Sequence, residues 1–299
     1  MLDETPLIDA AKQGRSVDVE ALLADGVDVN ESLPTGHTAL HIASYEGHYD
    51  VVTSLLAANA RVSQPSIDGA TPLHAAAESG CADVASLLLG SGAAIEHADS
   101  DGFTPLCVAC DFGHADVVSV LLAKDADLTY KSADDISPRQ LACMGGTGAH
   151  AKLFAVLVSN GVDLSQPLDA SGNTPMIVAC QRGHIAAVSA LIALGVTTSP
   201  VGVLGSAPLS TAAEYGHKLV VEKLLTANAL LDQTDVCGKT ALMFACQSGH
   251  AEIASGLLAA NAAVDARSFL GSTALQVASY HGHAGIVSVL LAATANVNL

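Results

Sequence analysis

The chain has 299 residues; half of them are hydrophobic, only ten are aromatic, and the formal net charge is −18. The apolar content is enough for a folded core and argues against a disordered chain, while the negative charge argues against nucleic acid or an anionic membrane as a partner. Seven cysteines in a chain of this length, and an N-terminus with neither a basic nor an apolar region, favour a cytosolic or nuclear protein with reduced thiols.

A helix start recurs along the chain every 33 residues. Thr is a favoured N-cap residue and Pro fits the first position of a helix, so the triplet Thr-Pro-Leu predicts a helix that ends at the Gly that follows. The triplet or a variant of it begins at Thr5, Thr38, Thr71, Thr104, Ser137, Thr174, Ala207, Thr240 and Thr273. Only the spacing from Ser137 to Thr174 departs from 33, and it is 37.

A second helix is predicted behind each first helix, usually after a Gly-His pair, as in His114–Ala123. A Gly, or an Asn at 59, 228 and 261, ends this helix because both residue types tolerate the left-handed conformation. One helix–turn–helix unit cannot bury both of its helices alone, so the units are expected to stack and share a core. The nine units cover about residues 1–32, 33–65, 66–98, 99–131, 132–168, 169–201, 202–234, 235–267 and 268–299.

The fifth unit is irregular. Its first helix starts with Ser137-Pro-Arg, and we expect three extra residues in the turn at 144–148 and one more near 167–173. In the seventh unit, Ala207 stands where the capping Thr belongs. The uncharged stretch 185–213 is interrupted by Gly and Pro, so we predict a buried helix followed by a loop and not a membrane span.

Two segments carry a family resemblance. Residues 71–80, Thr-Pro-Leu-His-Ala-Ala-Ala-Glu-Ser-Gly, and residues 113–122, Gly-His-Ala-Asp-Val-Val-Ser-Val-Leu-Leu, resemble the ankyrin repeat, and the resemblance covers essentially the whole chain. It implies an all-α fold, an ankyrin-repeat helical solenoid with short β-hairpin or turn tips, as one array over residues 1–299. It also implies a concave face that binds proteins but no single function, because ankyrin arrays recognise many unrelated partners.

The histidines and cysteines follow the repeat, which argues against a metal or catalytic site. One column of His at the start of the second helices comprises His48, His114, His150, His184, His217, His250 and His283; His41 and His74 form another. Neighbours in a column lie about 10 Å apart, too far to share one zinc ion. Cys110, Cys143, Cys180 and Cys246 share a position that needs a small side chain. We therefore expect no catalytic residue, no cofactor and no metal, and no enzyme activity.

The resemblance places partner binding at the tips and at the two residues before the Gly that ends each first helix. Six of the ten aromatic residues fall on this surface, and exposed aromatic side chains on a rigid face act as binding anchors. The residues expected to bind partners are Tyr45, Glu46, Glu78, Phe103, Asp111, Phe112, Arg182, Leu204, Tyr215, Phe269, Leu270 and Tyr280.

Charge is uneven along the chain. Residues 1–135 hold 22 acidic and five basic residues, whereas residues 136–299 hold eight and seven. This predicts a basic partner segment at residues 1–135, attracted electrostatically, and an apolar partner surface at residues 200–281. The acidic half resembles ankyrin arrays that mask basic segments of transcription factors.

Two further expectations concern the ends of the chain. The resemblance implies that Leu22 with Asp28-Val29-Asn30 has the spacing of an acceptor site for an asparaginyl hydroxylase, with Asn30 modified; the alternative is that Asn30 serves turn geometry. The last helix, 283–293, carries no charge, and nothing follows to cover its Ile286, Val287, Val289 and Leu290. We therefore expect that the native chain continues, or that this end self-associates or frays.

The main functional hypothesis is a non-enzymatic protein–protein interaction scaffold or adaptor that binds partners on its concave face and tips. Two alternatives stay open. One is that the chain is the recruiting segment of a larger enzyme, channel or ubiquitin-ligase subunit. The other is that it is an effector delivered into host cells.

Overall fold

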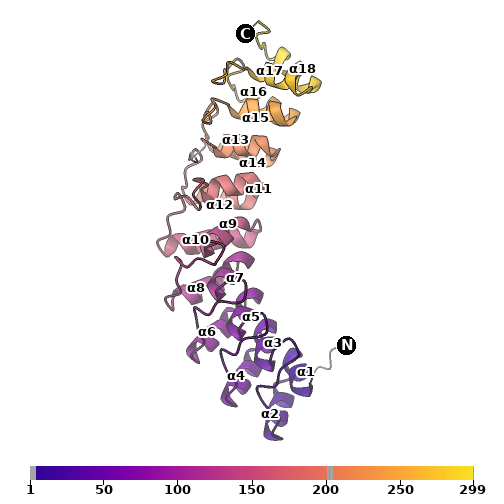
Figure 1. The fold of residues 1–299 in the computed structure, drawn as a ribbon, viewed down its shortest axis with the longest axis vertical. Coiled ribbons are helices and arrows are strands. Elements are labelled where there is room, and N and C mark those ends of the chain that lie inside the picture. Colours follow the sequence, from indigo (N-terminus) through magenta and orange to yellow (C-terminus); the bar gives the residue numbers. More distant parts are fainter. Residues whose placement is uncertain (1–4, 201, 203–204, 299) are drawn as a thin grey trace. The chain divides into compact units, whose positions relative to one another are not determined.

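Capping residues set the helix ends where the repeat predicts them. The computed structural model describes residues 5–200, 202 and 205–298, and within them the chain is all-α (Figure 1). The Thr104 hydroxyl accepts the backbone N–H of Cys107, Pro105 is the first residue of its helix, and Gly113 ends that helix at φ 77°. The first helices of the repeats are α1 (Pro6–Lys12), α3 (Ala39–Glu46), α5 (Pro72–Ser79), α7 (Pro105–Phe112), α9 (Pro138–Met144), α11 (Pro175–Arg182), α13 (Pro208–Glu214), α15 (Ala241–Ser248) and α17 (Ala274–Tyr280).

In every repeat except the fifth, the second helix packs against the first. The second helices are α2 (Ser16–Ala24), α4 (Tyr49–Ala57), α6 (Ala82–Gly90), α8 (Ala115–Leu122), α10 (Gly148–Ser159), α12 (Ile185–Ala193), α14 (Lys218–Thr226), α16 (Ala251–Ala259) and α18 (Ala284–Ala292). Asn59, Asn228 and Asn261 take left-handed conformations behind α4, α14 and α16, as predicted. In the described segments, no helix reaches the length and apolarity that crossing a membrane requires.

The chain divides into two compact units, Met1–Ala142 and Cys143–Leu299. Within the first, α1, α3, α5 and α7 pack in succession, as do α2, α4, α6 and α8 (Figure 1). Within the second, the odd-numbered helices from α11 to α17 pack in succession, as do the even-numbered helices from α10 to α18. Their cores are aliphatic. In α4, for example, the buried residues are Val51, Val52 and Leu55.

The extra residues of the fifth repeat lie elsewhere than predicted. Thr147, 33 residues after His114, is the N-cap of α10, and α10 has 12 residues where α8 has eight. The expectation of three extra residues in the turn at 144–148 is therefore wrong, because they extend the second helix. The fourth extra residue does lie near 167–173: the turn closes through Leu168 N–H and Asn173 C=O, five residues apart, whereas Asp99 bonds Phe103, four apart.

The tips are turns. They are closed by backbone hydrogen bonds such as Ser66 N–H to Ala70 C=O at 2.8 Å, and some neighbouring tips are linked by bonds such as Ser100 N–H to Asp68 C=O at 2.8 Å. The β-hairpin component is limited, in the described part of the chain, to a single bridge between Ser32 and Thr38.

Candidate functional site

In each unit, the ends of the first helices place side chains in solvent. Each of these helices ends at a left-handed Gly or a short turn, and the side chains just before that end extend into solvent. Tyr45, Phe112 and Tyr215 are 46%, 49% and 50% exposed, and Tyr280 is 88% exposed. These four rings lie at predicted binding positions, and their exposure makes them available to a partner.

In the first unit, acidic residues accompany the rings. Glu46, Glu78 and Asp111 are exposed at the carboxyl ends of α3, α5 and α7. A carboxylate at this end of a helix opposes the helix macrodipole, so helix stability does not account for these residues. Phe112 stacks on His114, with ring centroids 6.2 Å apart.

Phe103 is less exposed than other predicted binding residues such as Phe112. Its side chain is half-buried, and its backbone carbonyl accepts bonds from the His74 ring at 3.0 Å and from Asp99 N–H at 2.9 Å. The hydrogen bond from His74 therefore fixes the tip that carries Phe103 to the preceding repeat.

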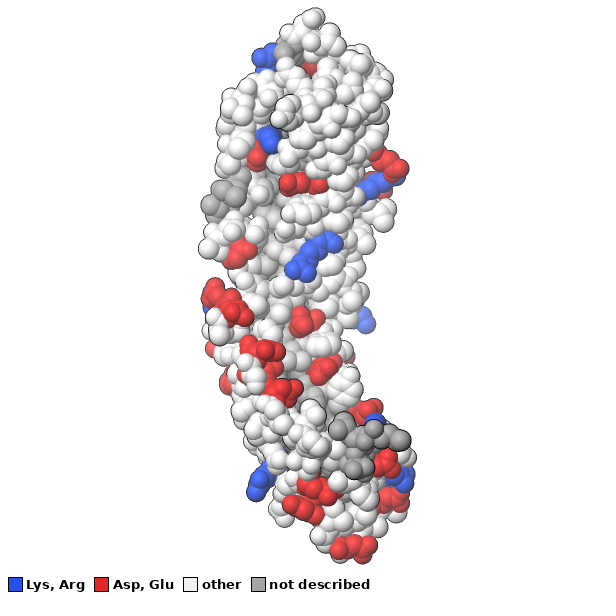
Figure 2. All heavy atoms as spheres, turned by 45° about the vertical axis from the view of Figure 1, so that its right-hand side comes forward, with Lys and Arg blue, Asp and Glu red and all other residues white. Residues whose placement is uncertain are grey.

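Carboxylates dominate the surface of the first unit. The first unit occupies the lower part of Figure 2, where many acidic and few basic side chains are visible. Two of the bases are already paired: Arg15 with Asp9 and Asp18 at 2.7 and 2.8 Å, and Lys131 with Asp135 at 2.6 Å.

In the second unit, the predicted residues make polar contacts between repeats. The Tyr215 hydroxyl accepts a bond from Gln181 at 3.1 Å, and Arg182 donates to the Met144 carbonyl at 3.4 Å. Both side chains remain exposed. Leu204 lies outside the described residues.

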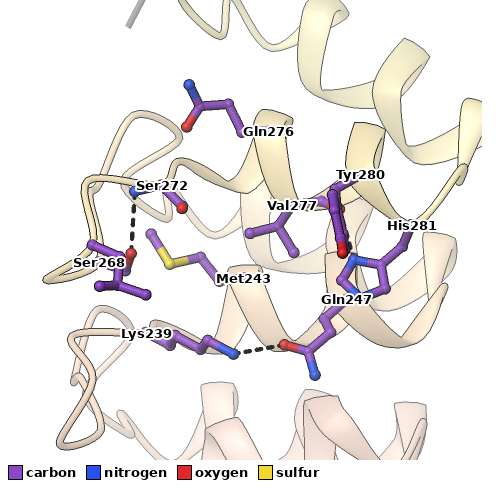
Figure 3. Close-up of a pocket in the computed structure, with 10 residues that line it drawn as sticks. Lys239, Met243, Gln247, Ser268, Ser272, Gln276, Val277, Tyr280 and His281 are labelled. Atoms are coloured by element: carbon purple, nitrogen blue, oxygen red, sulfur yellow. Dashed lines mark hydrogen bonds between the residues drawn. The ribbon is translucent and has the colours of Figure 1, made fainter.

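A groove of about 500 Å³ lies between α15 and α17 and their tips (Figure 3). Met243 and Val277 lie between the tip residues on one side and Tyr280 and His281 on the other. Of the predicted residues, the groove brings together Leu270 and Tyr280. The lining residues are Lys239, Met243, Gln247, Ser268, Leu270, Ser272, Gln276, Val277, Tyr280 and His281.

The repeat pattern did not predict that Met243, a buried residue that is 1% exposed, lines this groove. Met243 is the third residue of α15, the position that holds His41 and His74 in earlier repeats. Since Ile8 and Ile177 hold the same position in α1 and α11, an apolar residue there gave no signal of the groove. Phe269, which was predicted, is 78% exposed beside the groove, and its ring lies over Gly238 of the preceding tip.

The histidines connect neighbouring repeats. His41 and His74 are buried; Nδ1 accepts the N–H of Thr38 or Thr71 at 3.1 Å, and Nε2 lies 3.1 or 3.0 Å from the carbonyl of Ala70 or Phe103. This geometry assigns the proton to Nε2, which donates to the carbonyl. Burial lowers the pKa of His41 to about 4 and also lowers that of His74.

The assignment of His150 to the other histidine column is wrong. His48, His114, His184, His217, His250 and His283 each place Nε2 within 2.8–3.2 Å of a backbone carbonyl in the preceding repeat. His150 instead lies buried inside α10, where its Nδ1 is 2.8 Å from the Thr147 hydroxyl. The shift follows from the extension of α10, because Thr147 takes the column position.

The cysteines are reduced and mostly buried. All seven are free thiols; Cys81 is half-buried and Cys237 exposed. Burial raises the pKa of Cys107 and Cys180, and that of Cys246 to about 12, so these thiols are poor nucleophiles. No cluster of three or more His, Cys, Asp or Glu suited to a metal occurs within residues 5–200, 202 and 205–298.

Asn30 belongs to a column of turn residues whose side-chain oxygens hold the next repeat. Its Oδ1 accepts the Arg61 backbone N–H at 2.8 Å, which favours the turn-geometry role; hydroxylation of Asn30 stays a prediction. Equivalent bonds of 2.8–3.1 Å join Ser63 to Ala94, Glu96 to Asp127, Ser199 to Leu230, Asp232 to Ala263 and Asp265 to Asn296.

The last helix is better covered than predicted. Ile286 and Leu290 are buried, because α18 packs on α16 and α17. The expectation that both lack cover is therefore wrong. Val287 and Val289 are half-buried, and Leu291 is 46% exposed.

Family models of ankyrin repeats match most of the chain. The model described as ankyrin repeats in three copies matches residues 2–66, 55–132 and 209–299, and the model described as ankyrin repeats in many copies matches residues 140–192. The comparison with curated proteins found no match.

Proposed function

Because the chain belongs to the ankyrin-repeat family, whose repeats are protein-interaction modules, we propose that it is a non-enzymatic scaffold or adaptor. It binds partner proteins through the tips and the exposed ends of its first helices. The observation that carries this proposal is that exposed rings, Tyr45, Phe112, Tyr215 and Tyr280, recur in both units at one repeat position or its neighbour. The same surface serves whether the chain acts alone or recruits for a larger protein.

Two partner chemistries follow from the two units. In the first, the exposed Glu46, Glu78 and Asp111 beside Tyr45 and Phe112 suit a basic segment that carries apolar or aromatic residues. In the second, Phe269, Leu270 and Tyr280 suit an apolar surface. Free buried thiols support a reducing compartment, the cytosol or nucleus.

A set of surface variants tests the proposal. Partners are captured with the full chain and identified, and binding is then measured for the variant Y45S/F112S/Y215S. Its control is Tyr49→Ser with Leu219→Ser, since Tyr49 and Leu219 lie on second helices and are 48% and 65% exposed. We expect the first set to weaken binding at least about tenfold, because aromatic anchors contribute 2 kcal/mol or more each. Equal binding by both variants would overturn the proposal.

A further inference from the structure

Lys239 lines one side of the groove on the last two repeats, and none of the other lining residues is an Asp or Glu. Among the ten residues that line the groove, Lys239 is the only one that carries a full charge at neutral pH. The nearest acidic residue along the chain is Asp235. One of its oxygens, Oδ1, already accepts the backbone N–H groups of Cys237 and Lys239 at 2.9 and 2.7 Å.

The ammonium of Lys239 is held by neutral groups. It donates to Gln247 Oε1 at 2.8 Å (Figure 3). It also lies 5.6 Å from the centroid of the Phe244 ring. An ammonium has three N–H donors, so at least one N–H remains for a ligand after these two contacts. Withdrawing a cation partly from water costs free energy that an anionic partner offsets.

The remainder of the groove is apolar or neutral. Met243, 1% exposed, and the half-buried Val277 lie at its centre. Leu270 and Tyr280 also line it and are 93% and 88% exposed. Side chains of this size left in water favour an apolar ligand.

We propose that this groove binds a short apolar segment of a partner protein that carries one acidic side chain, whose carboxylate pairs with Lys239. The inference rests on the proposed protein-binding function and specifies the ligand of this one surface. It differs from the ligand of the first unit in the sign of its charge, because the first unit presents carboxylates. A point-charge ammonium suits a single carboxylate oxygen and places no bidentate demand on the ligand.

The test uses the full 299-residue chain and three peptide libraries. All are N-acetylated, C-amidated heptapeptides with Leu, Ile, Val, Phe and Ala randomised around a fixed central residue, which is Glu, Gln or Lys. We expect the chain to retain the Glu library about threefold to tenfold better than the Gln library, which is the difference that one partly desolvated ion pair produces. The Lys library reports on the carboxylates of the first unit, so its retention should not change when Lys239 is replaced.

Matched variants locate the site. Lys239→Met removes the charge and keeps the apolar stem, so it should abolish the preference for Glu over Gln. Lys223→Met removes the same charge from α14, which does not line the groove, and should keep the preference. Leu270→Ser and Tyr280→Ser should lower retention of the Glu and Gln libraries alike.

Three results would overturn the inference. They are equal retention of the Glu and Gln libraries, a preference that persists in Lys239→Met, and concentration-dependent self-association abolished by Leu270→Ser with no peptide retained. The last would make a second copy of the chain the occupant. None of these touches Tyr45, Phe112 or Tyr215, so the proposed scaffold function stands or fails by its own experiment.

Discussion

His41 and His74 each satisfy three requirements at one position. The ring caps its own helix through Nδ1, bonds the next tip through Nε2, and fills space in the interior. The imidazole must be neutral to do so, because Nδ1 accepts a hydrogen bond. Protonation would remove that acceptor and place a charge in the core.

Stability should therefore decrease in acid through these residues. The pKa of His41 is lowered to about 4 by burial, whereas an exposed His titrates near 6.5, so its contribution is complete above pH 6.5 and is lost as the pH falls towards 4. At pH 5 the loss from His41 is about 2 kcal/mol relative to neutral pH. Urea unfolding at pH 7.5 and pH 5 measures it.

The control for this titration is His41→Gln with His74→Gln. Gln caps α17 in the same way, since Gln276 Oε1 accepts the Thr273 N–H at 3.0 Å. The double variant should be less stable than the parent at pH 7.5, having lost the ring contacts, but should lose less stability between pH 7.5 and 5. An identical pH dependence would show that these rings do not carry the effect.

The carboxylates of Glu46 and Glu78, near the carboxyl ends of α3 and α5, should lower the stability of the fold and strengthen the binding of a basic partner. Glu46→Gln with Glu78→Gln removes charges that oppose the helix dipole, so the free energy of unfolding should rise by a few tenths of a kcal/mol per site at low salt. The same variant should bind a capped (Lys-Gly)₄ peptide more weakly. Thermal unfolding and fluorescence anisotropy measure the two effects.

Asp50→Asn with Asp83→Asn is the matched control. It removes the same charge from the first turns of α4 and α6, where carboxylates favour the dipole. We expect lower stability and a smaller loss of affinity. If both double variants bind the peptide equally weakly, total charge and not the helix-end surface attracts it.

At the scale of elements, repeat 5 shows how an insertion is absorbed. The three additional residues lengthen α10. As a result the His150 ring packs against Gly145, and the His184 ring packs against Gly146. A Cβ at Gly145 would lie 1.8 Å from His150 Nε2, and one at Gly146 would lie 2.2 Å from His184 Nδ1. Both glycines are therefore required by close approach and not by a left-handed φ.

Two alanine substitutions separate packing from helix propensity. Gly145→Ala should lower the free energy of unfolding by about 2 kcal/mol, because the buried His150 has to move. Gly148→Ala, three residues along, meets nothing within 4 Å and lies at the start of α10. It should be neutral or stabilising by up to about 1 kcal/mol. If urea unfolding gives the two variants equal stability, the contact with His150 is not a constraint.

The sequence predicted the helix pairs because caps, left-handed stops and the apolar pattern all recur together every 33 residues. It did not place the insertion in α10, because Gly-rich residues 145–148 look like a long turn, and only the position of Thr147 relative to His114 marks the helix start. It indicated the exposed rings through their repeat position. It did not place Met243 in the groove, because the groove depends on the spacing of two neighbouring repeats and not on the sequence of either one.

At the scale of the whole molecule, protection should decrease towards the last repeat. Among the described helices, α18 packs on α16 and α17, whereas α16 also packs on α14 and α15. Stability in a repeat array depends on neighbours, so in the 299-residue chain amides of 284–292 should exchange faster than those of 251–259. Hydrogen exchange with mass spectrometry checks this, with light scattering to exclude a dimer; equal protection in a monomer would contradict it.

The column of turn acceptors has a consequence for how such a chain can change over generations. The bond from Asn30 to Arg61 N–H recurs with Ser63, Glu96, Ser199, Asp232 and Asp265 as the acceptor. What the joint retains is an oxygen atom offered to a backbone amide, and neither partner has to be a particular residue type. A repeat copied or exchanged by recombination therefore finds a usable joint wherever the preceding repeat offers a side-chain oxygen at this position. The array can acquire new surface residues by reshuffling whole repeats, without a compensating mutation in the neighbour.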